Sequence, residues 1–229
     1  MKTVVISKYE KPDYATQEAL NTICSNVLYA GLNVKKILIT SVSAGDGKTY
    51  TSLLMAQNFA SRGMRVLLID ADLRRSQLIA HYKIKFEEDH MGLANYLAGY
   101  STLEESVYGT NIENLYLIPI GRTVNNPIPL FNGDRIAKLI ESAYTQYNMV
   151  IIDAPPVGLV IDAIELARHC DGSVLVACYN TTTKRNLLDI KQKMLNVGLP
   201  ILGCVINKVN MDSLTVKKYY NNSYYYRRE

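Results

Sequence analysis

Short runs of aliphatic residues alternate along this chain with longer segments in which apolar residues recur at the helical period. The aliphatic runs are 37–40, 66–69, 115–118, 149–152, 173–177 and 201–206, and the helical segments are 15–30, 49–62, 135–147, 162–169 and 183–196. This alternation predicts strands joined by crossover helices, which form a mostly parallel sheet. Most of the runs are apolar throughout, so we expect an α/β fold with helices on both faces of the sheet.

The domain organisation follows from length and composition. The 229 residues are 48% hydrophobic and 20% charged, which is the balance of one globular domain. We expect this domain to span residues 1–216. Residues 217–229 contain no aliphatic side chain, so we expect a flexible tyrosine-rich tail. Residues 121–133 contain two prolines and three asparagines and are expected to form a long functional loop.

Several classes of protein are excluded by simple counts. No apolar run approaches the roughly 20 residues that span a bilayer, and the first residues lack the apolar core of a signal peptide, so we expect a cytoplasmic protein. The net charge of +4 is too small for a dedicated nucleic-acid binder. The four cysteines lack the spacing of a zinc site or a disulfide framework, and we expect them to be reduced and mostly buried.

A glycine-rich segment that ends in lysine and threonine lies between the first predicted strand and the second predicted helix. A phosphate-binding loop needs inward backbone N–H groups, glycines beside the phosphates, a lysine and a Mg²⁺-binding hydroxyl. Gly45, Gly47, Lys48 and Thr49 supply these groups, although the strict P-loop pattern would have glycine at Val42. The other interpretation is a glycine turn that opens a helix. The expected nucleotide contacts are Ala44, Gly45, Asp46, Gly47, Lys48, Thr49 and Tyr50.

Acidic side chains follow two further apolar runs at the point where each predicted strand ends. Asp70 and Asp72 follow one run, with Arg74 close behind, and Asp153 follows another. Ligands of open parallel sheets bind outside the carboxyl ends of the strands, so these carboxylates and Thr49 should surround one crevice. Taken singly, Asp153 is also consistent with a helix cap or turn, and the Asp70 and Asp72 pair with a solvated loop.

These motifs resemble those of the bacterial tyrosine kinases that control capsule and exopolysaccharide synthesis, in the Gram-positive form that is a separate cytoplasmic protein. The resemblance extends from about Glu18 to the tail. It is carried by a deviant Walker A segment (45–49), a Walker A′ segment (68–74) and a Walker B segment (151–156), with support from 126–127, 160–163, 202–208 and the terminal tyrosines.

The resemblance implies ATP and Mg²⁺ as cofactors and assigns roles to particular residues. Lys48 would contact the β- and γ-phosphates, Thr49 and Asp153 would hold Mg²⁺, and Asp70 and Asp72 would share metal positioning and activation of the tyrosine hydroxyl. The expected catalytic residues are Lys48, Asp70, Asp72, Asp153 and Arg74, and the expected metal ligands are Thr49, Asp70 and Asp153. Arg74 fits either stabilisation of the transferred charge or a surface salt bridge, and Asn207 fits either an adenine contact or a strand-end turn.

The resemblance also implies partners. A separate transmembrane regulator of polysaccharide chain length would activate the kinase and recruit it to the inner face of the membrane, and a cognate protein-tyrosine phosphatase would oppose it. Self-association is expected, but the ring-forming E-x-x-R-x-x-R motif is incomplete, because Asn21 and Cys24 replace both arginines after Glu18.

The tail supplies candidate phosphate acceptors, which are Tyr219, Tyr220, Tyr224, Tyr225 and Tyr226. Basic residues flank them and would favour entry into a neighbour's anionic nucleotide site, so we expect autophosphorylation in trans. The alternative for the tail is a basic and aromatic segment that binds a membrane surface or a partner. For the whole chain, the alternatives are a positioning ATPase of the ParA and MinD type, or a nucleotide-gated adaptor without kinase activity.

Overall fold

The computed structural model describes residues 2–8, 11–31 and 33–209. In this part of the chain, nine strands form one sheet in the order β4-β1-β5-β6-β3-β7-β2-β8-β9. The strands are β1 (Thr3–Ile6), β2 (Lys36–Ser41), β3 (Val66–Asp70), β4 (Ile84–Lys85), β5 (Tyr108–Thr110), β6 (Leu115–Ile118), β7 (Met149–Asp153), β8 (Gly172–Cys178) and β9 (Ile201–Asn207). The pairs β1–β4 and β5–β6 are antiparallel, and the other pairs are parallel.

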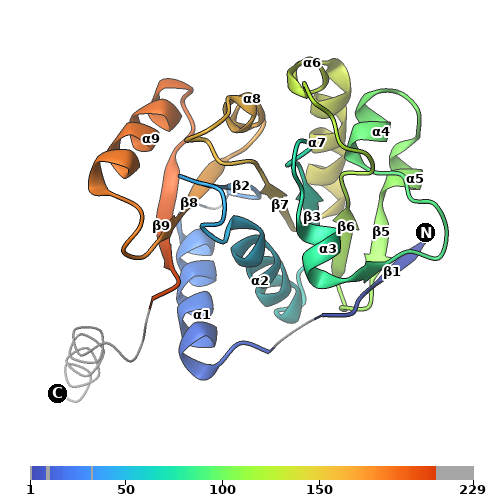
Figure 1. Ribbon diagram of the computed structural model, residues 1–229. Helices are drawn as coiled ribbons and strands as arrows, with labels where there is room; N and C mark the ends of the chain where they lie inside the picture. The colour runs from blue at the N-terminus through green and yellow to red at the C-terminus, as the bar shows by residue number, and fades with distance from the viewer. Residues whose placement is uncertain (1, 9–10, 32, 210–229) are drawn as a thin grey trace.

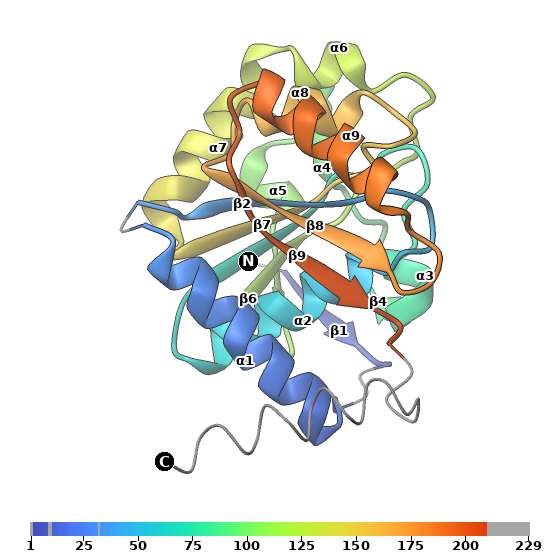
Figure 2. The same ribbon diagram turned by 90° about the vertical axis from the view of Figure 1, so that its left-hand side faces the viewer.

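Helices cover both faces of this sheet, as Figures 1 and 2 show. Side chains of α1 (Tyr14–Tyr29), α2 (Lys48–Ser61) and α3 (Leu78–Tyr82) pack in the core on one face. The other face is covered by α4 (Leu93–Leu97), α6 (Ile128–Phe131), α7 (Asp134–Gln146), α8 (Asp162–Ala167) and α9 (Lys184–Asn196), and α5 (Leu103–Ser106) lies beside α4. None of the helices in the described residues combines the length and apolar character that a bilayer span requires.

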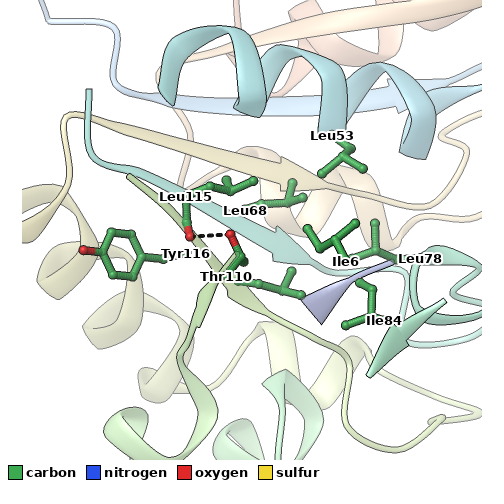
Figure 3. A pocket seen from close by; sticks show the side chains of 9 residues that line it. Ile6, Leu53, Leu68, Leu78, Ile84, Thr110, Leu115 and Tyr116 are labelled. Atoms are coloured by element: carbon green, nitrogen blue, oxygen red, sulfur yellow. Dashed lines mark hydrogen bonds between the residues drawn. The ribbon is translucent and has the colours of Figure 1, made fainter. Parts of the chain in front are cut away.

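The central strands are apolar throughout because their side chains alternate between two buried layers. Leu68 of β3 belongs to the core under α1 and α2, and its neighbour Leu67 belongs to the core under α7. Figure 3 shows the first of these layers, where Leu53 of α2, Leu68 and Leu78 of α3 lie around one small apolar pocket. This packing holds the start of α2 beside the end of β3, which is where the functional side chains lie.

The predicted α/β fold is confirmed, and each predicted strand and helix is present with shifts of only a few residues at the ends. Three strands were missed, namely β1, β4 and β5, which have four, two and three residues. Runs this short carry too little periodicity to be recognised. The expected loop at 121–133 is interrupted by α6, whose N-cap is Pro127 and whose first turn contains Pro129, a position where proline is tolerated. The tail and the boundary after residue 216 lie outside the described residues.

The two edges of the sheet differ. One edge is the two-residue strand β4, whereas the other is the seven-residue strand β9, which faces the viewer in Figure 2 between α9 and α1. Among the described residues β9 pairs with β8 alone, and the side chains of Cys204 and Ile206 are exposed. The expectation of mostly buried cysteines is therefore wrong: only Cys24 is fully buried, and Cys170 and Cys178 are partly exposed.

Candidate active site

The glycine-rich loop connects β2 to α2 and has the backbone of an anion-binding site. Gly45 and Gly47 have φ values of 83° and 98°, in the left-handed region that side chains disfavour. Gly47 is also the N-cap of α2, so the positive end of the helix dipole faces the loop. Asp46 folds back within the loop and accepts a hydrogen bond of 2.8 Å from the Ser43 N–H. These features fit bound phosphates.

Lys48 is the first residue of α2, and its ammonium group lies among carboxylates. Its Nζ is 3.0 Å from Asp72 Oδ2, 3.9 Å from Asp153 Oδ1 and 3.4 Å from Thr49 Oγ1. Burial opposes the charged form of Lys48, but the charges of Asp153 and Asp72 outweigh this effect and raise its pKa. Lys48 is therefore a cation that is held by the carboxylates of Asp72 and Asp153.

Asp70 ends β3 and is fully buried. Asp70 is in register with Asp153 of the neighbouring strand β7, so two carboxylates end adjacent parallel strands. One carboxylate oxygen of Asp70 accepts a hydrogen bond from the Ser76 hydroxyl, and the other has no hydrogen-bond partner among the described residues. Desolvation, followed by the charge of Asp153, raises the pKa of Asp70 to about 8. A buried oxygen without a partner is an available ligand position.

Asp153 ends β7 and is 1% exposed. Ser52 lies one helical turn after Lys48, with its Oγ 3.2 Å from Asp153 Oδ1 and 2.9 Å from the Lys48 carbonyl oxygen. Desolvation raises the pKa of Asp153, and Lys48 and the hydroxyls of Thr49 and Ser52 oppose the shift. The interpretation of Asp153 as a helix cap is not supported, because its carboxylate contacts the side chains of Ser52 and Lys48 and the N-caps of α2 and α8 are other residues.

Arg74 binds a carboxylate outside the group that surrounds Lys48. Its Nε and Nη2 donate to the two carboxylate oxygens of Asp162 at 2.5 and 3.0 Å, and its Nη1 donates to the Asn125 carbonyl oxygen at 2.5 Å. Asp162 is the first residue of α8 and is 1% exposed. Of the two interpretations open for Arg74, this arrangement matches the salt bridge, with a carboxylate that is buried.

Asn207 ends β9 and lies against the glycine-rich loop. Its side-chain Nδ2 donates to the Asp46 carbonyl oxygen at 2.9 Å. A Cβ atom built on Gly47 would lie 1.9 Å from Asn207 Nδ2, so the two residues fit only if position 47 has no side chain. Asn207 thus lies at the nucleotide loop, where its amide holds the loop backbone.

The structure therefore brings together the side chains of Lys48, Thr49, Asp70, Asp72 and Asp153 at the carboxyl ends of the strands. Tyr50 is 40% exposed at the start of α2. Sequence reasoning missed Ser52 and Ser76, which contact Asp153 and Asp70. The four-residue spacing from Lys48 to Ser52, which places both on one helix face, was a signal for Ser52. The acceptor tyrosines of the tail lie outside the described residues.

The donors at this site fit Mg²⁺ bound to a nucleotide. Mg²⁺ prefers hard oxygen ligands and is usually held by one or two carboxylates together with phosphate oxygens and water. The unpartnered oxygen of Asp70, the Thr49 hydroxyl and Asp153 are ligands of this kind. Across the described ranges, His, Cys, Asp and Glu side chains form no cluster of three or more that would hold a metal without phosphate.

Comparison with known proteins agrees with this geometry. A family model described as an AAA domain matches residues 34–183. The tyrosine-protein kinase CpsD of Streptococcus pneumoniae serotype 4 is 36% identical over 203 residues, which are 89% of this chain and 87% of that protein.

Two solved structures have similar folds and match this chain over different shares of its length. The chimerical protein CapA2B2 has a TM-score of 0.81 and 28% identity, with 91% of this chain and 94% of that chain covered. The septum site-determining protein MinD of Pyrococcus horikoshii, complexed with Mg-ADP, has a TM-score of 0.66 and 25% identity, with 79% and 72% covered. The chain shares its nucleotide-binding fold with MinD but matches the kinases over more of its length, and it therefore belongs to the CpsD family of bacterial protein-tyrosine kinases.

Proposed function

We propose that this tyrosine kinase uses Mg-ATP to phosphorylate the tyrosines of its own C-terminal tail, in trans, and that it thereby regulates the synthesis and chain length of a capsular or exopolysaccharide. One observation carries the proposal: Lys48 lies within ion-pair distance of Asp72 and Asp153 at the edge of the sheet where the glycine-rich loop begins α2. Phosphoryl transfer depends on positioning and charge neutralisation more than on covalent chemistry, and these groups provide both.

Each residue of the site has a defined task in this proposal. The backbone of residues 44–50 and the Lys48 ammonium bind the phosphates, which requires Lys48 to exchange its carboxylate partners for phosphate oxygens. Thr49, Asp70 and Asp153 provide the oxygen ligands for Mg²⁺, which when bound neutralises charge on the transferred phosphoryl group. Asp70 or Asp72 accepts the proton of the tyrosine hydroxyl as the bond from phosphorus to the tyrosine oxygen forms and the bond to ADP breaks.

The partners proposed are a transmembrane chain-length regulator that activates the kinase, a phosphatase that reverses the reaction, and further copies of this chain. CapA2B2 is by its name a chimerical protein, and its likeness to this chain supports a kinase that works together with a second component. An exposed apolar pair next to the site, Leu159 and Ile161, is 64% and 52% exposed and offers a contact for such a component.

Phosphotyrosine detection tests the proposal. The full chain is incubated with Mg-ATP and the cytoplasmic peptide of the regulator, and it is compared with Lys48→Met and with a chain that ends at Val216. We expect label on the wild type and none on either variant. The matched control is Lys191→Met, which removes an exposed lysine of α9 and should label normally.

Two results would contradict the proposal. Strong label on the chain that ends at Val216 would show that the tail is not the acceptor. ATP turnover without any phosphotyrosine would instead favour the positioning ATPase, the fold of which the chain shares with MinD.

A further inference from the structure

Three loops meet at the Arg74 side chain. Arg74 belongs to the loop that follows β3 and Asn125 to the loop before α6, and Asp162 is the first residue of α8, where the loop from β7 ends. The planar guanidinium group binds both oxygens of Asp162 and, with its remaining nitrogen, the Asn125 carbonyl oxygen. A backbone hydrogen bond of 2.8 Å from the Val124 N–H to the Leu73 carbonyl oxygen joins the first two loops again.

The loop fixed by Arg74 also carries Asp72. The N–H of Arg75 donates to the Asp72 carboxylate at 3.2 Å, and Asp72 in turn lies 3.0 Å from Lys48. The position of the Asp72 carboxylate therefore depends on a loop that is anchored at Arg74, two residues further along the chain.

The third loop is anchored independently to the strand that leads into the glycine-rich loop. The Thr40 hydroxyl donates to the Pro155 carbonyl oxygen at 2.7 Å and accepts from the Val157 N–H at 3.1 Å. Gly158 lies so close to Val42 that an added Cβ would be 2.1 Å from the Val42 carbonyl oxygen. Asp162 is thus a buried, fixed anchor, and Arg74 connects the loop that carries Asp72 to it.

We infer that Arg74 and Asp162 are a positioning pair, which holds the Asp72 loop in the geometry required for phosphoryl transfer without touching the phosphates. Only the expected effect on the rate of phosphoryl transfer rests on the proposed function. Small displacements of a catalytic carboxylate lower the rate of the chemical step. Nucleotide affinity should change little, because the glycine-rich loop and Lys48 lie on other elements.

A double-mutant cycle with Arg74→Lys and Asp162→Asn tests this inference. We expect each variant to lower kcat by about tenfold or more, while the dissociation constant of a fluorescent ATP analogue stays within about twofold of the wild type. The double variant should be no worse than either single variant, because both remove the same interaction. The matched control is Arg168→Lys, which alters the ion pair between the exposed Arg168 side chain, at the end of α8, and Glu165.

Three results would overturn the inference. If Arg74→Lys lowers kcat and Asp162→Asn does not, Arg74 acts directly on the transferred group. If the two effects multiply in the double variant, the residues act separately. A parallel loss of nucleotide affinity in both variants would show that the pair supports the nucleotide site as a whole.

Hydrogen exchange of the free protein gives a readout that does not depend on kinase activity. In Asp162→Asn, the amides of residues 71–76 and 122–126 should exchange faster than in the wild type, while those of β3 stay protected. Unchanged exchange in these segments would contradict the positioning role. A wild type without phosphotyrosine activity would contradict the proposed function alone, since the exchange experiment would still test the pair.

Discussion

Single residues of the active site lower the stability of the folded protein and are suited to bind a cation. The Asp70 carboxyl group is fully buried, next to Asp153, and only one of its oxygens has a hydrogen-bond partner among the described residues. A buried carboxylate with this environment is costly, which its raised pKa reports directly. The same features make Asp70 suited to bind a cation. The charged form of Asp70, which burial disfavours in the free protein, would be stabilised by a bound cation.

We predict that Asp70→Asn stabilises the free protein at alkaline pH. The pKa of Asp70 is raised from 3.8 to about 8 on folding, so the folded state binds the proton more tightly and wild-type stability falls as pH rises between these values. The variant lacks this loss and should gain about 1–3 kcal/mol in unfolding free energy at pH 8 and little at pH 4. Urea unfolding at both pH values, without Mg²⁺ or nucleotide, measures the difference. An equal effect at both values would contradict it.

Asn207 supports the glycine-rich loop from a strand that is distant in sequence. Its amide donates to the Asp46 carbonyl oxygen, so Asn207→Ala should free the loop and weaken binding of a fluorescent ATP analogue by about fivefold, the equivalent of one hydrogen bond. Asn207→Asp should be at least as harmful, because a carboxylate cannot donate to the carbonyl oxygen. The control is Asn196→Ala on the exposed end of α9. Wild-type affinity in Asn207→Ala would show that the hydrogen bond does not support binding.

Among the secondary-structure elements, α2 connects the active site to the core. Gly47 and Lys48 begin this helix at the phosphate loop, and all residues from Thr51 to Ala60 are buried. Apolar residues lie all around α2, because one face of this helix packs on the sheet and another is covered by α1. The position of Lys48 thus depends on the packing of the whole helix.

Phe59→Ala tests how much the packing of α2 contributes to the stability of the core. Phe59 is fully buried near the end of α2, so its truncation should lower the unfolding free energy by about 3–5 kcal/mol. Leu188→Ala on α9 is the matched comparison: the side chain is 53% exposed, and the loss should be below about 1 kcal/mol. Denaturant unfolding of both variants provides the measurement. Similar losses in the two would show that α2 is not a principal part of the core.

For the molecule as a whole, the route from the sheet to the tail bears on how the tail reaches an active site. Asn207 contacts the glycine-rich loop, and residues 210–229 begin three positions later. Tyr219, the first candidate acceptor, follows Asn207 by twelve positions in the sequence. Reaction within one chain and reaction between chains both have to be tested.

A mixing experiment distinguishes the two routes. Full-length Lys48→Met has the tail but no phosphate-binding lysine, and a chain ending at Val216 has an intact site but no tail. Reaction in trans predicts phosphotyrosine on the Lys48→Met chain when both are mixed with Mg-ATP and the regulator peptide. The rate should rise with the concentration of the shorter chain. If neither chain becomes labelled although the wild type does, the reaction occurs within one chain.

Much of the fold and site could be predicted from local pattern. The apolar runs and helical periods identified the principal strands and helices, because burial on one or two faces is recorded in the spacing of apolar residues. Lys48, Asp70 and Asp153 were placed at one edge because parallel strands present their carboxyl ends on the same side. The contact of Ser76 with Asp70 and the short strands β1, β4 and β5 were not predicted, because the sequence around them shows no motif or periodicity.

Local periodicity therefore sufficed for the α/β class, the phosphate loop and the grouping of its carboxylates. The sequence did not predict which side chains contact each other. Arg74 meets Asp162 across 88 positions and Asn207 meets Asp46 across 161, and these pairings follow from the order of strands in the sheet. Strand order is a property of packing between distant segments, whereas the spacing of apolar residues reports only which faces are buried.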